Sequence, residues 1–512
     1  MAYKLPQTIQ PKKSSNFRFA FTCAIFASMA CIILGYDIGV MSGAAIYIKR
    51  DLKITDVQLE VLIGILNLYS LIGSFAAGRT SDWMGRRYTV VFAATIFFTG
   101  ALVMGFAVNY AMLMAGRFVA GVGVGYAIMI APVYTAEISP AAARGFLTSF
   151  PEVFINFGIL LGYVSNYAFA RLPLHLGWRV MLGVGAVPSV LLAFMVLVMP
   201  ESPRWLVMKG RLADARAVLE RTTDTPEDAK QRLSDIKAAA GIPNDLNGDV
   251  VTVPKKQSSE ESQVWRELVF SPTPAMRRIL FSVLGLQFFQ QASGIDSVVL
   301  YSPRVFKTAG ITDDNQLLGT TCAVGVTKTL TILIATFLFD KLGRRPLVLS
   351  SVGGMVVSLV GLGTGLAVVG HHSADARVPW AVALCIASIL AFVSFFSIGL
   401  GPIAPVYTSE VFPLRVRALG FAFGVACNRV TSGVVSMTFL SLSNAITIGG
   451  SFFLYSGVAA LAWLFFFFFL PETRGLTLEA MGKLFGMEDE DIAVADADAA
   501  ATTEKAVELH TK

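Results

Sequence analysis

Long apolar runs alternate with short polar segments along most of the chain. A membrane-spanning helix needs about 20 apolar residues, and these runs are too long and too unalternating to be strands. Unpaired strand edges inside lipid would also be too costly. The pattern therefore predicts an all-α integral membrane protein with twelve transmembrane helices, at 19–42, 59–77, 88–107, 111–135, 146–169, 178–199, 279–306, 316–339, 346–369, 379–408, 418–443 and 449–470.

The polar segments divide these helices into two groups of six. The first residues are polar and basic and lack the short apolar core and cleavage site of a secretory signal, so we expect the first helix to be retained. The acidic, Ala-rich end of the chain predicts disorder. The expected organisation is a cytoplasmic tail (1–18), a six-helix bundle (19–199), a cytoplasmic linker (200–278), a second six-helix bundle (279–470) and an acidic cytoplasmic tail (471–512).

The linker is the one long hydrophilic segment between apolar runs. Helical patterns occur at 211–221 and 226–240, separated by GIPNDLNGD. Two interpretations stay open: a solvated linker, or short helices that pack beneath the bundle.

Composition and charge agree with a membrane protein. Hydrophobic residues make up 54% of the chain and charged residues 15%, which nearly excludes a soluble multi-domain enzyme. Most of the 41 Lys and Arg residues lie in segments on the side of the N-terminus, so both termini and the linker are expected in the cytoplasm. The five cysteines lie inside apolar runs, without metal-ligand spacing.

The two halves of the sequence repeat each other. IAPVYTAE at 130–137 returns as IAPVYTSE at 403–410, and SDWMGRR at 81–87 returns as FDKLGRR at 339–345. An Arg follows the Glu of each first motif seven residues later, and PESPR in one half matches PETRG in the other. Parallel six-helix repeats are typical of transporters that hold their substrate between the two halves.

These motifs carry a family resemblance. Together with GRFVAGVGVG, QQASGID and SEVFPLRVRALG, they resemble the sugar porter family of the major facilitator superfamily. LGYDIGVMSGA and SFPEVFINFGILLGYVSNYA are similar to plant polyol/monosaccharide proton symporters. The resemblance implies the major facilitator fold, with two six-helix pseudo-repeats that rock to give alternating access.

Two charges near helix ends form a candidate proton-coupling pair. Asp37 lies in the first predicted helix and Arg117 opens the fourth. Either one is also compatible with a simple interfacial position, but charged residues inside membranes are functional candidates by default. The resemblance pairs the two positions, and a carboxylate whose contact with an Arg changes during the cycle gains and loses a proton.

The expected substrate site combines amides with unusual charges. The resemblance implies neutral polar side chains there, and Gln287, Gln290, Gln291 and Asn428 match them. Pro405 stands where relatives carry Trp. Charged residues replace neutral or aromatic ones at four further positions, and we infer that they pair, either to read a polyol or only to fix helix packing: Glu152, Asp296, Lys328 and Arg429.

Charges at the predicted cytoplasmic helix ends form a candidate gate. Positive-inside topology alone accounts for any single Arg, but the mirrored Glu and Arg spacing favours a latch that holds the cytoplasmic ends together. The resemblance implies the same role. The gate residues are Asp82, Arg86, Arg87, Glu137, Arg144, Glu201, Asp340, Arg344, Arg345, Glu410, Arg417 and Glu472.

The glycines at 121, 123 and 125 superficially match a dinucleotide-binding fingerprint. No strand precedes them and their setting is apolar, so close helix packing is the better interpretation. No P-loop or nucleophile–base pair stands out either, which disfavours an enzyme.

The sequence thus predicts a proton-coupled symporter that imports linear polyols such as sorbitol or mannitol, with cyclitols and monosaccharides as further candidates. A facilitative sugar carrier and a transporter-like nutrient receptor remain alternatives. We expect a monomer in the plasma membrane, with the proton as co-substrate and the bilayer as surroundings, and without cofactor, metal or nucleic acid.

Overall fold

The computed structural model describes residues 15–473 except for 140–143, 224, 241, 243–247, 249, 252–269, 271, 372–378 and 413–415. The side chains of residues 15–17, 144–145, 239, 338–341, 409–410 and 417–418 are not described. Both predicted tails lie wholly or largely outside this range. In the described part every secondary-structure element is a helix, apart from one isolated β-bridge between Arg211 and Val250.

The N-terminal half supplies the first six predicted spans. Two of those spans are each divided between two helices, α1 with α2 and α8 with α9. The helices are α1 (Ser15–Ser28), α2 (Cys31–Leu52), α3 (Asp56–Met84), α4 (Arg86–Gly105), α5 (Tyr110–Ile138), α6 (Arg144–Leu147), α7 (Phe150–Phe169), α8 (Leu174–Gly183) and α9 (Ala186–Leu197).

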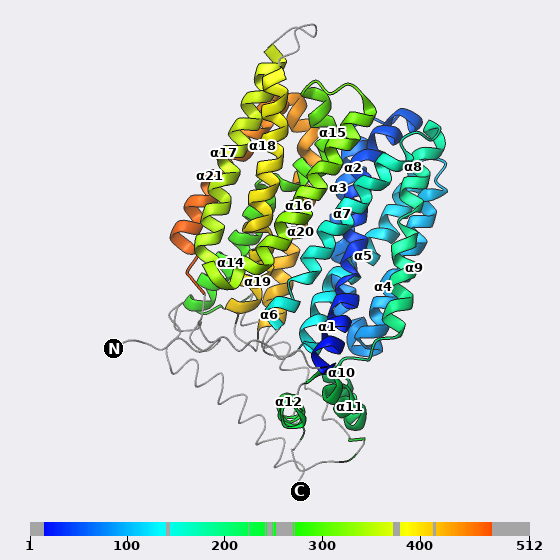
Figure 1. Cartoon of the computed structure of the whole chain (residues 1–512), viewed down its shortest axis with the longest axis vertical. Helices are drawn as coiled ribbons and strands as arrows, with labels where there is room; N and C mark the ends of the chain where they lie inside the picture. Colours follow the sequence, from blue (N-terminus) through cyan, green and yellow to red (C-terminus); the bar gives the residue numbers. More distant parts are fainter. Residues whose placement is uncertain are drawn as a thin grey trace.

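The C-terminal half supplies the other six spans. Here α14 with α15, and α18 with α19, each form one broken span. The helices are α14 (Pro274–Ala292), α15 (Ile295–Thr308), α16 (Asp314–Leu342), α17 (Arg344–His371), α18 (Pro379–Ile398), α19 (Leu400–Val411), α20 (Arg417–Ile446) and α21 (Ile448–Phe469). Figure 1 shows this half standing beside the N-terminal one.

Short helices of the linker lie beneath the N-terminal half (Figure 1), as the second interpretation of the linker expected: α10 (Pro203–Met208), α11 (Leu212–Thr222) and α12 (Pro226–Ala239). They share a small apolar core that includes Leu206, Leu219 and Leu233. Arg232 of α12 donates to the carbonyl of Ser139 at 2.8 Å, which ties the linker to the end of α5. We call this end of the bundle the inner end, and the end with the α2–α3 turn the outer end.

Side chains at the first residues fix where several helices begin. The Thr55 hydroxyl accepts from the backbone N–H of Gln58 at 3.2 Å, and the Gln58 side chain accepts from the Thr55 N–H at 3.0 Å. This reciprocal capping box satisfies two backbone donors at the start of α3. Asn109 caps α5 in the simpler way, accepting from Met112 at 2.8 Å.

Nine helical segments in the described part are long and apolar enough to cross a membrane. The three remaining predicted spans correspond to α7, to α14 with α15, and to α20. These helices carry the buried polar and charged residues that the sequence assigned to a substrate site, which lowers their hydropathy. The all-helical membrane architecture is as predicted.

Glycines let helices of the N-terminal half approach closely. A Cβ atom on Gly125 would lie 2.0 Å from the carbonyl oxygen of Ser70, and one on Gly123 would lie 2.7 Å from the backbone nitrogen of Phe97. The glycines after Arg117 therefore serve helix packing of α5 against α3 and α4, as the apolar setting predicted.

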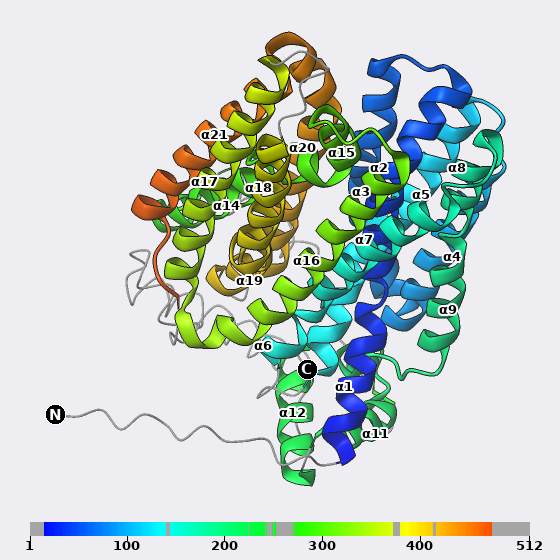
Figure 2. The same cartoon turned by 45° about the horizontal axis from the view of Figure 1, so that its top comes forward.

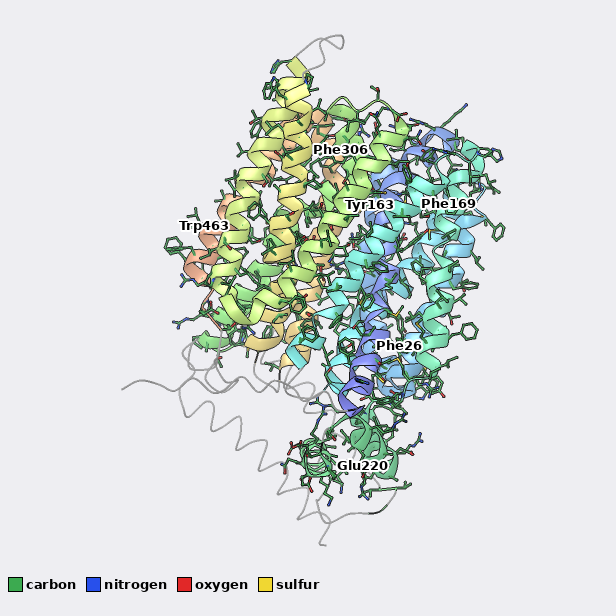
Figure 3. All side chains as sticks on the ribbon, in the orientation of Figure 1. Phe26, Tyr163, Phe169, Glu220, Phe306 and Trp463 are labelled. Carbon is green, nitrogen blue, oxygen red and sulfur yellow. The ribbon has the colours of Figure 1, made fainter. Side chains whose placement is uncertain are left out.

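The two halves meet along α7 with α16, α3 with α20, and α2 with α15. Figure 2 shows α7 and α16 side by side. Tyr163 of α7, labelled in Figure 3, donates its hydroxyl to the carbonyl of Val299 in α15 at 2.8 Å. The helices that carry the expected substrate-site residues lie beside these contacts.

Candidate functional site

Asp37 and Arg117 form a buried ion pair. Nη1 of Arg117 lies 2.6 and 2.8 Å from the two carboxylate oxygens of Asp37, and the residues are 1% and 2% exposed, Arg117 being the more buried. Arg117 also donates to the carbonyls of Leu62 and Ile63 at 3.0 and 3.1 Å. The guanidinium thus joins α2, α3 and α5 at one point, and a charge-assisted contact of this kind is strong.

A broken helix positions the amides of the expected substrate site. The chain leaves α14 after Ala292 and enters α15 at Ile295, through Gly294 at φ +87°. A Cβ atom there would also lie 2.7 Å from the Tyr455 ring, so glycine fits both the backbone and the space. Backbone that leaves the helical pattern at membrane depth is typical of transporter substrate sites.

Four amides from α14 and α20 form one hydrogen-bonded network. Nδ2 of Asn428 donates to Oε1 of Gln290 at 2.6 Å and to Oε1 of Gln287 at 3.0 Å. Nε2 of Gln291 donates to Oδ1 of Asn428 at 3.2 Å. Oε1 of Gln291 is buried without a partner in the described part. The structure thus joins the four predicted amides and leaves one acceptor able to receive a hydroxyl.

Pro405 supports this network from α19. Because Pro has no N–H, it leaves the carbonyl four residues earlier, that of Gly401, without its helical donor. Nε2 of Gln290 donates to that carbonyl at 2.7 Å. Pro405, which stands where the resembling family has Trp, therefore frees a carbonyl that holds an amide of the expected substrate site.

The four unusual charges lie in one cluster between the halves. Lys328 of α16 is within electrostatic range of Glu152 and Asp296, and so is Arg429 of α20. None of the ion pairs in the described part of the chain joins two of these four residues. The direct pairs that the charge balance suggested are not formed here, and the charges balance as a group.

Neutral partners take the place of direct pairs. Nη2 of Arg429 donates to Oδ1 of Asn428 at 2.6 Å, which links the charges to the amide network. Asp296 accepts from the hydroxyl of Ser432. The ammonium of Lys328 lies 5.9 Å from the centre of the Phe396 ring. Its three donors have no hydrogen bond to another described residue, so they are available to a substrate.

At the inner end, Arg86 holds the gate residues of the N-terminal half. It contacts Glu137 at 3.1 Å and Asp82 at 3.0 Å. Glu201 accepts from the backbone N–H of Arg86 at 2.8 Å and from that of Arg87 at 3.2 Å. Burial raises the pKa of Glu201, against the opposing effect of the backbone donors around it. These contacts all lie within one half.

The C-terminal half repeats part of this arrangement. Glu472 accepts from the backbone N–H groups of Arg344 and Arg345, each at 3.0 Å, at the start of α17. A carboxylate at a helix N-terminus is favoured by the helix dipole. The repeated motifs therefore build equivalent helix starts. The side chains of the other predicted gate residues lie outside the described residues: Arg144, Asp340, Glu410 and Arg417.

Sequence reasoning missed contacts that join the halves at the outer end. Glu60 of α3 is 2% exposed and accepts from the backbone N–H and the hydroxyl of Ser441 in α20, each at 2.6 Å. Asp56 contacts Lys49 at 2.6 Å and, across the halves, Arg304 of α15 at 3.1 Å. The available sequence signal was that Glu60 is an acidic residue just inside the predicted span at 59–77.

Asn156 is a second missed residue. It is 1% exposed, one turn after Glu152 on α7, and its Nδ2 donates to the Glu152 carbonyl at 2.7 Å. Its Oδ1 is buried without a partner in the described part. The hydroxyl of Thr329, next to Lys328, donates to the Asn156 carbonyl at 3.3 Å. Asn156 therefore lies at the junction of the halves, beside the charged cluster.

Membrane-length helices in two repeats, with broken helices and buried polar groups between them, define a secondary transporter. Comparison with known proteins gives its family. Residues 23–485 match the family model described as "Sugar (and other) transporter". The chain belongs to this family, within the major facilitator superfamily, and is a multi-pass membrane transporter of sugars or polyols rather than an enzyme.

Individual relatives agree. "Polyol transporter 5" of Arabidopsis thaliana is 62% identical, over 94% of this chain and 89% of its own. "Putative polyol transporter 1" of the same plant is 61% identical, over 93% of each chain. The solved proton:xylose symporter XylE, bound to 6-bromo-6-deoxy-D-glucose, matches with a TM-score of 0.75 and 28% identity, over 92% of this chain and 100% of its own.

Proposed function

We propose that this protein is a proton-coupled symporter that imports linear polyols across the plasma membrane. The observation that carries the proposal is the buried pair of Asp37 with Arg117, at 2.6 Å. A carboxylate held by one guanidinium, away from water, is suited to switch between a paired charged form and an unpaired protonated form. The XylE neighbour, described as a proton:xylose symporter, supports the coupling.

The pair connects the proton to helix movement. Arg117 is held by two carbonyls of α3 as well as by Asp37 of α2. When Asp37 takes up a proton, its attraction to Arg117 weakens while the bonds from Arg117 to α3 remain. Helix α2 is then freer to move relative to α3 and α5. Proton uptake thereby favours one conformation of the rocking cycle. The shift in the equilibrium equals the difference in proton-binding free energy between the two conformations.

The substrate class follows from the chemistry between the halves. Every polyol hydroxyl both donates and accepts, and the site offers the unpartnered oxygens of Gln291 and Asn156 and the donors of Lys328. A flexible, ring-free substrate has less need of an aromatic platform, and Pro405 replaces one. The names of the Arabidopsis relatives, all polyol transporters, support this assignment. Cyclitols and monosaccharides are further candidate substrates.

The inner-end charges act as the latch in this scheme. In the described residues, Arg86 bonds Glu137 and Asp82 of its own half. We propose that the predicted gate charges of the C-terminal half exchange with these partners when the inner end closes. Only a few kcal/mol separate such conformations, so a small network is sufficient to bias them.

An uptake panel tests the proposal. Polyols, cyclitols and hexoses are offered to cells expressing the protein at two pH values, with and without a protonophore. Uphill uptake of a hexitol that rises at acidic outside pH and collapses with protonophore is expected. Uptake that equilibrates without regard to the protonophore would instead identify a facilitative carrier. Counterflow in proteoliposomes separates both from a receptor, which would bind substrate without flux.

A further inference from the structure

A pocket of about 530 Å³ lies between the start of α14 and the end of α21, away from the substrate site. It opens at the inner end, on the outside of the bundle, where these helices end. The residues that give it its character are Arg277, Arg278, Phe281, Phe468 and Phe469.

The floor of the pocket is aromatic and ordered. The Phe281 ring lies 5.1 Å from that of Phe465 and 5.2 Å from that of Phe469, both in edge-to-face geometry. The hydroxyl of Ser282 donates to the carbonyl of Phe469 at 3.0 Å and ties the two helices together. Phe281 is 54% and Phe468 72% exposed. Phenyl surface this exposed, at the end of a membrane helix, faces lipid chains.

The rim of the pocket is cationic. Arg277 and Arg278 are exposed at the first turn of α14. Nε of Arg277 donates to the carbonyl of Pro272 at 3.1 Å, which fixes the direction of the guanidinium. Its two terminal nitrogens bond to no other residue in the described part of the chain, so they can bind a ligand. A planar guanidinium binds the oxygens of a phosphate through two parallel hydrogen bonds.

We propose that this pocket binds one anionic phospholipid of the cytoplasmic leaflet. The phosphate lies on the terminal nitrogens of Arg277, with the charge of Arg278 beside it, and an acyl chain runs along the phenyl floor. Charge asymmetry of the sequence puts this end of the bundle in the cytoplasm, and anionic lipids are concentrated in that leaflet. A soluble anion would use only the rim, whereas a lipid uses both the rim and the floor.

The test measures lipid binding to the purified full-length protein in detergent. Phosphatidylglycerol and phosphatidylcholine with identical chains are titrated while the thermal unfolding midpoint is followed. Native mass spectrometry counts the bound lipids in parallel. The wild-type protein is expected to retain one phosphatidylglycerol in preference to phosphatidylcholine and to gain a headgroup-specific rise in midpoint. Inorganic phosphate at equal concentration is expected to give no such rise.

Matched variants locate the site. Arg277→Gln with Arg278→Gln should lose at least half of the headgroup-specific rise, and Arg277→Lys with Arg278→Lys should keep most of it. Arg216→Gln removes an exposed Arg from α11, on the same side of the protein, and should behave as wild type. The proposal is overturned if the Gln variant keeps the full preference, if Arg216→Gln loses it equally, or if inorganic phosphate reproduces it. If the double variant does not fold, Arg277→Gln alone is measured by the same criteria.

Discussion

At the scale of single residues, two ion pairs of the N-terminal half differ in how far they are buried. Asp37 with Arg117 is nearly excluded from water, whereas Asp51 with Arg179 at the outer end, at 3.1 Å, is about one fifth exposed. Removing one partner of a buried pair typically costs about 3–5 kcal/mol, because the other charge is left uncompensated. Protonation of Asp37 also removes one charge of the pair, but reversibly.

Asp37→Asn should therefore abolish uphill accumulation of a polyol while substrate exchange without a gradient persists. The amide mimics a permanently protonated carboxyl, so the protein keeps a route through its cycle but loses the response to pH. Uptake and counterflow in proteoliposomes measure the two activities separately. Asp51→Asn removes the carboxylate of a partly buried pair at the outer end and is the matched control, which should keep proton-driven accumulation. Proton-driven accumulation by Asp37→Asn at the wild-type level would refute the assignment.

Lys328 gives a second prediction at this scale. Lys328→Met removes a cation that interacts with both Glu152 and Asp296 and leaves Arg429 to balance the two acids, so we expect severe loss of uptake. The double variant Lys328→Asn with Asp296→Asn removes one charge of each sign. It should reach the surface better than either single variant and shift preference from a hexitol toward a hexose. Additive losses in competitive uptake, with unchanged preference, would show that these charges neither compensate each other nor contact substrate.

At the scale of helices, the break before α19 and the proline within it act on a residue of another helix. The Gly401 carbonyl is satisfied by Gln290 rather than by its own helix. Pro405→Ala restores the missing N–H and closes the helical bond, so Gln290 loses this partner. We expect a rise of about three- to tenfold in the KM for polyol, consistent with one hydrogen bond of about 1 kcal/mol. Pro402→Ala, in the same helix, is the control, and equal effects of both variants would contradict the specific role of Pro405.

The sequence was sufficient to predict the helices, but not the contacts between their side chains. Apolar runs were sufficient to predict the all-helical architecture, and nine helical segments of the described part are long and apolar enough to cross a membrane. The break between α1 and α2 at Met29 and Ala30 has no Gly or Pro to announce it. The resemblance supplied the residues of the expected substrate site, and the structure brings its four amides into one network. The contacts of these residues were not predictable, because Glu152 and Lys328 come within electrostatic range only when α7 packs against α16.

The burial of Glu60 was also not predictable from the sequence. The sequence places it near the start of a predicted span and gives no indication of a partner. The structure buries it instead, because Ser441 of the opposite half supplies both hydrogen bonds. A contact between halves that are about 380 residues apart in sequence leaves no local pattern to read.

At the scale of the whole molecule, polar contacts join the halves at the outer end. Glu60 with Ser441 and Asp56 with Arg304 both cross from one half to the other. Alternating access requires such contacts to form and break in each cycle. They stabilise the state with the outer end closed, which is the conformation that the structure shows at this end.

Glu60→Ala should consequently shift the protein toward the state that is open to the outside. The variant loses two hydrogen bonds to a charged group, each worth about 1.5–3 kcal/mol, and about 1.4 kcal/mol is a tenfold change in a population. The reporter is Met437→Cys, because Met437 packs against Gly64 across the α3–α20 contact. Its labelling by a membrane-impermeant maleimide from outside should accelerate at least about tenfold in Glu60→Ala.

Glu60→Gln keeps an acceptor for Ser441, so its labelling rate should lie between those of Glu60→Ala and the protein with Glu60 intact. The parent protein without the added cysteine gives the background from the five native thiols. Equal labelling rates in all three proteins would show that Glu60 does not hold the outer end closed.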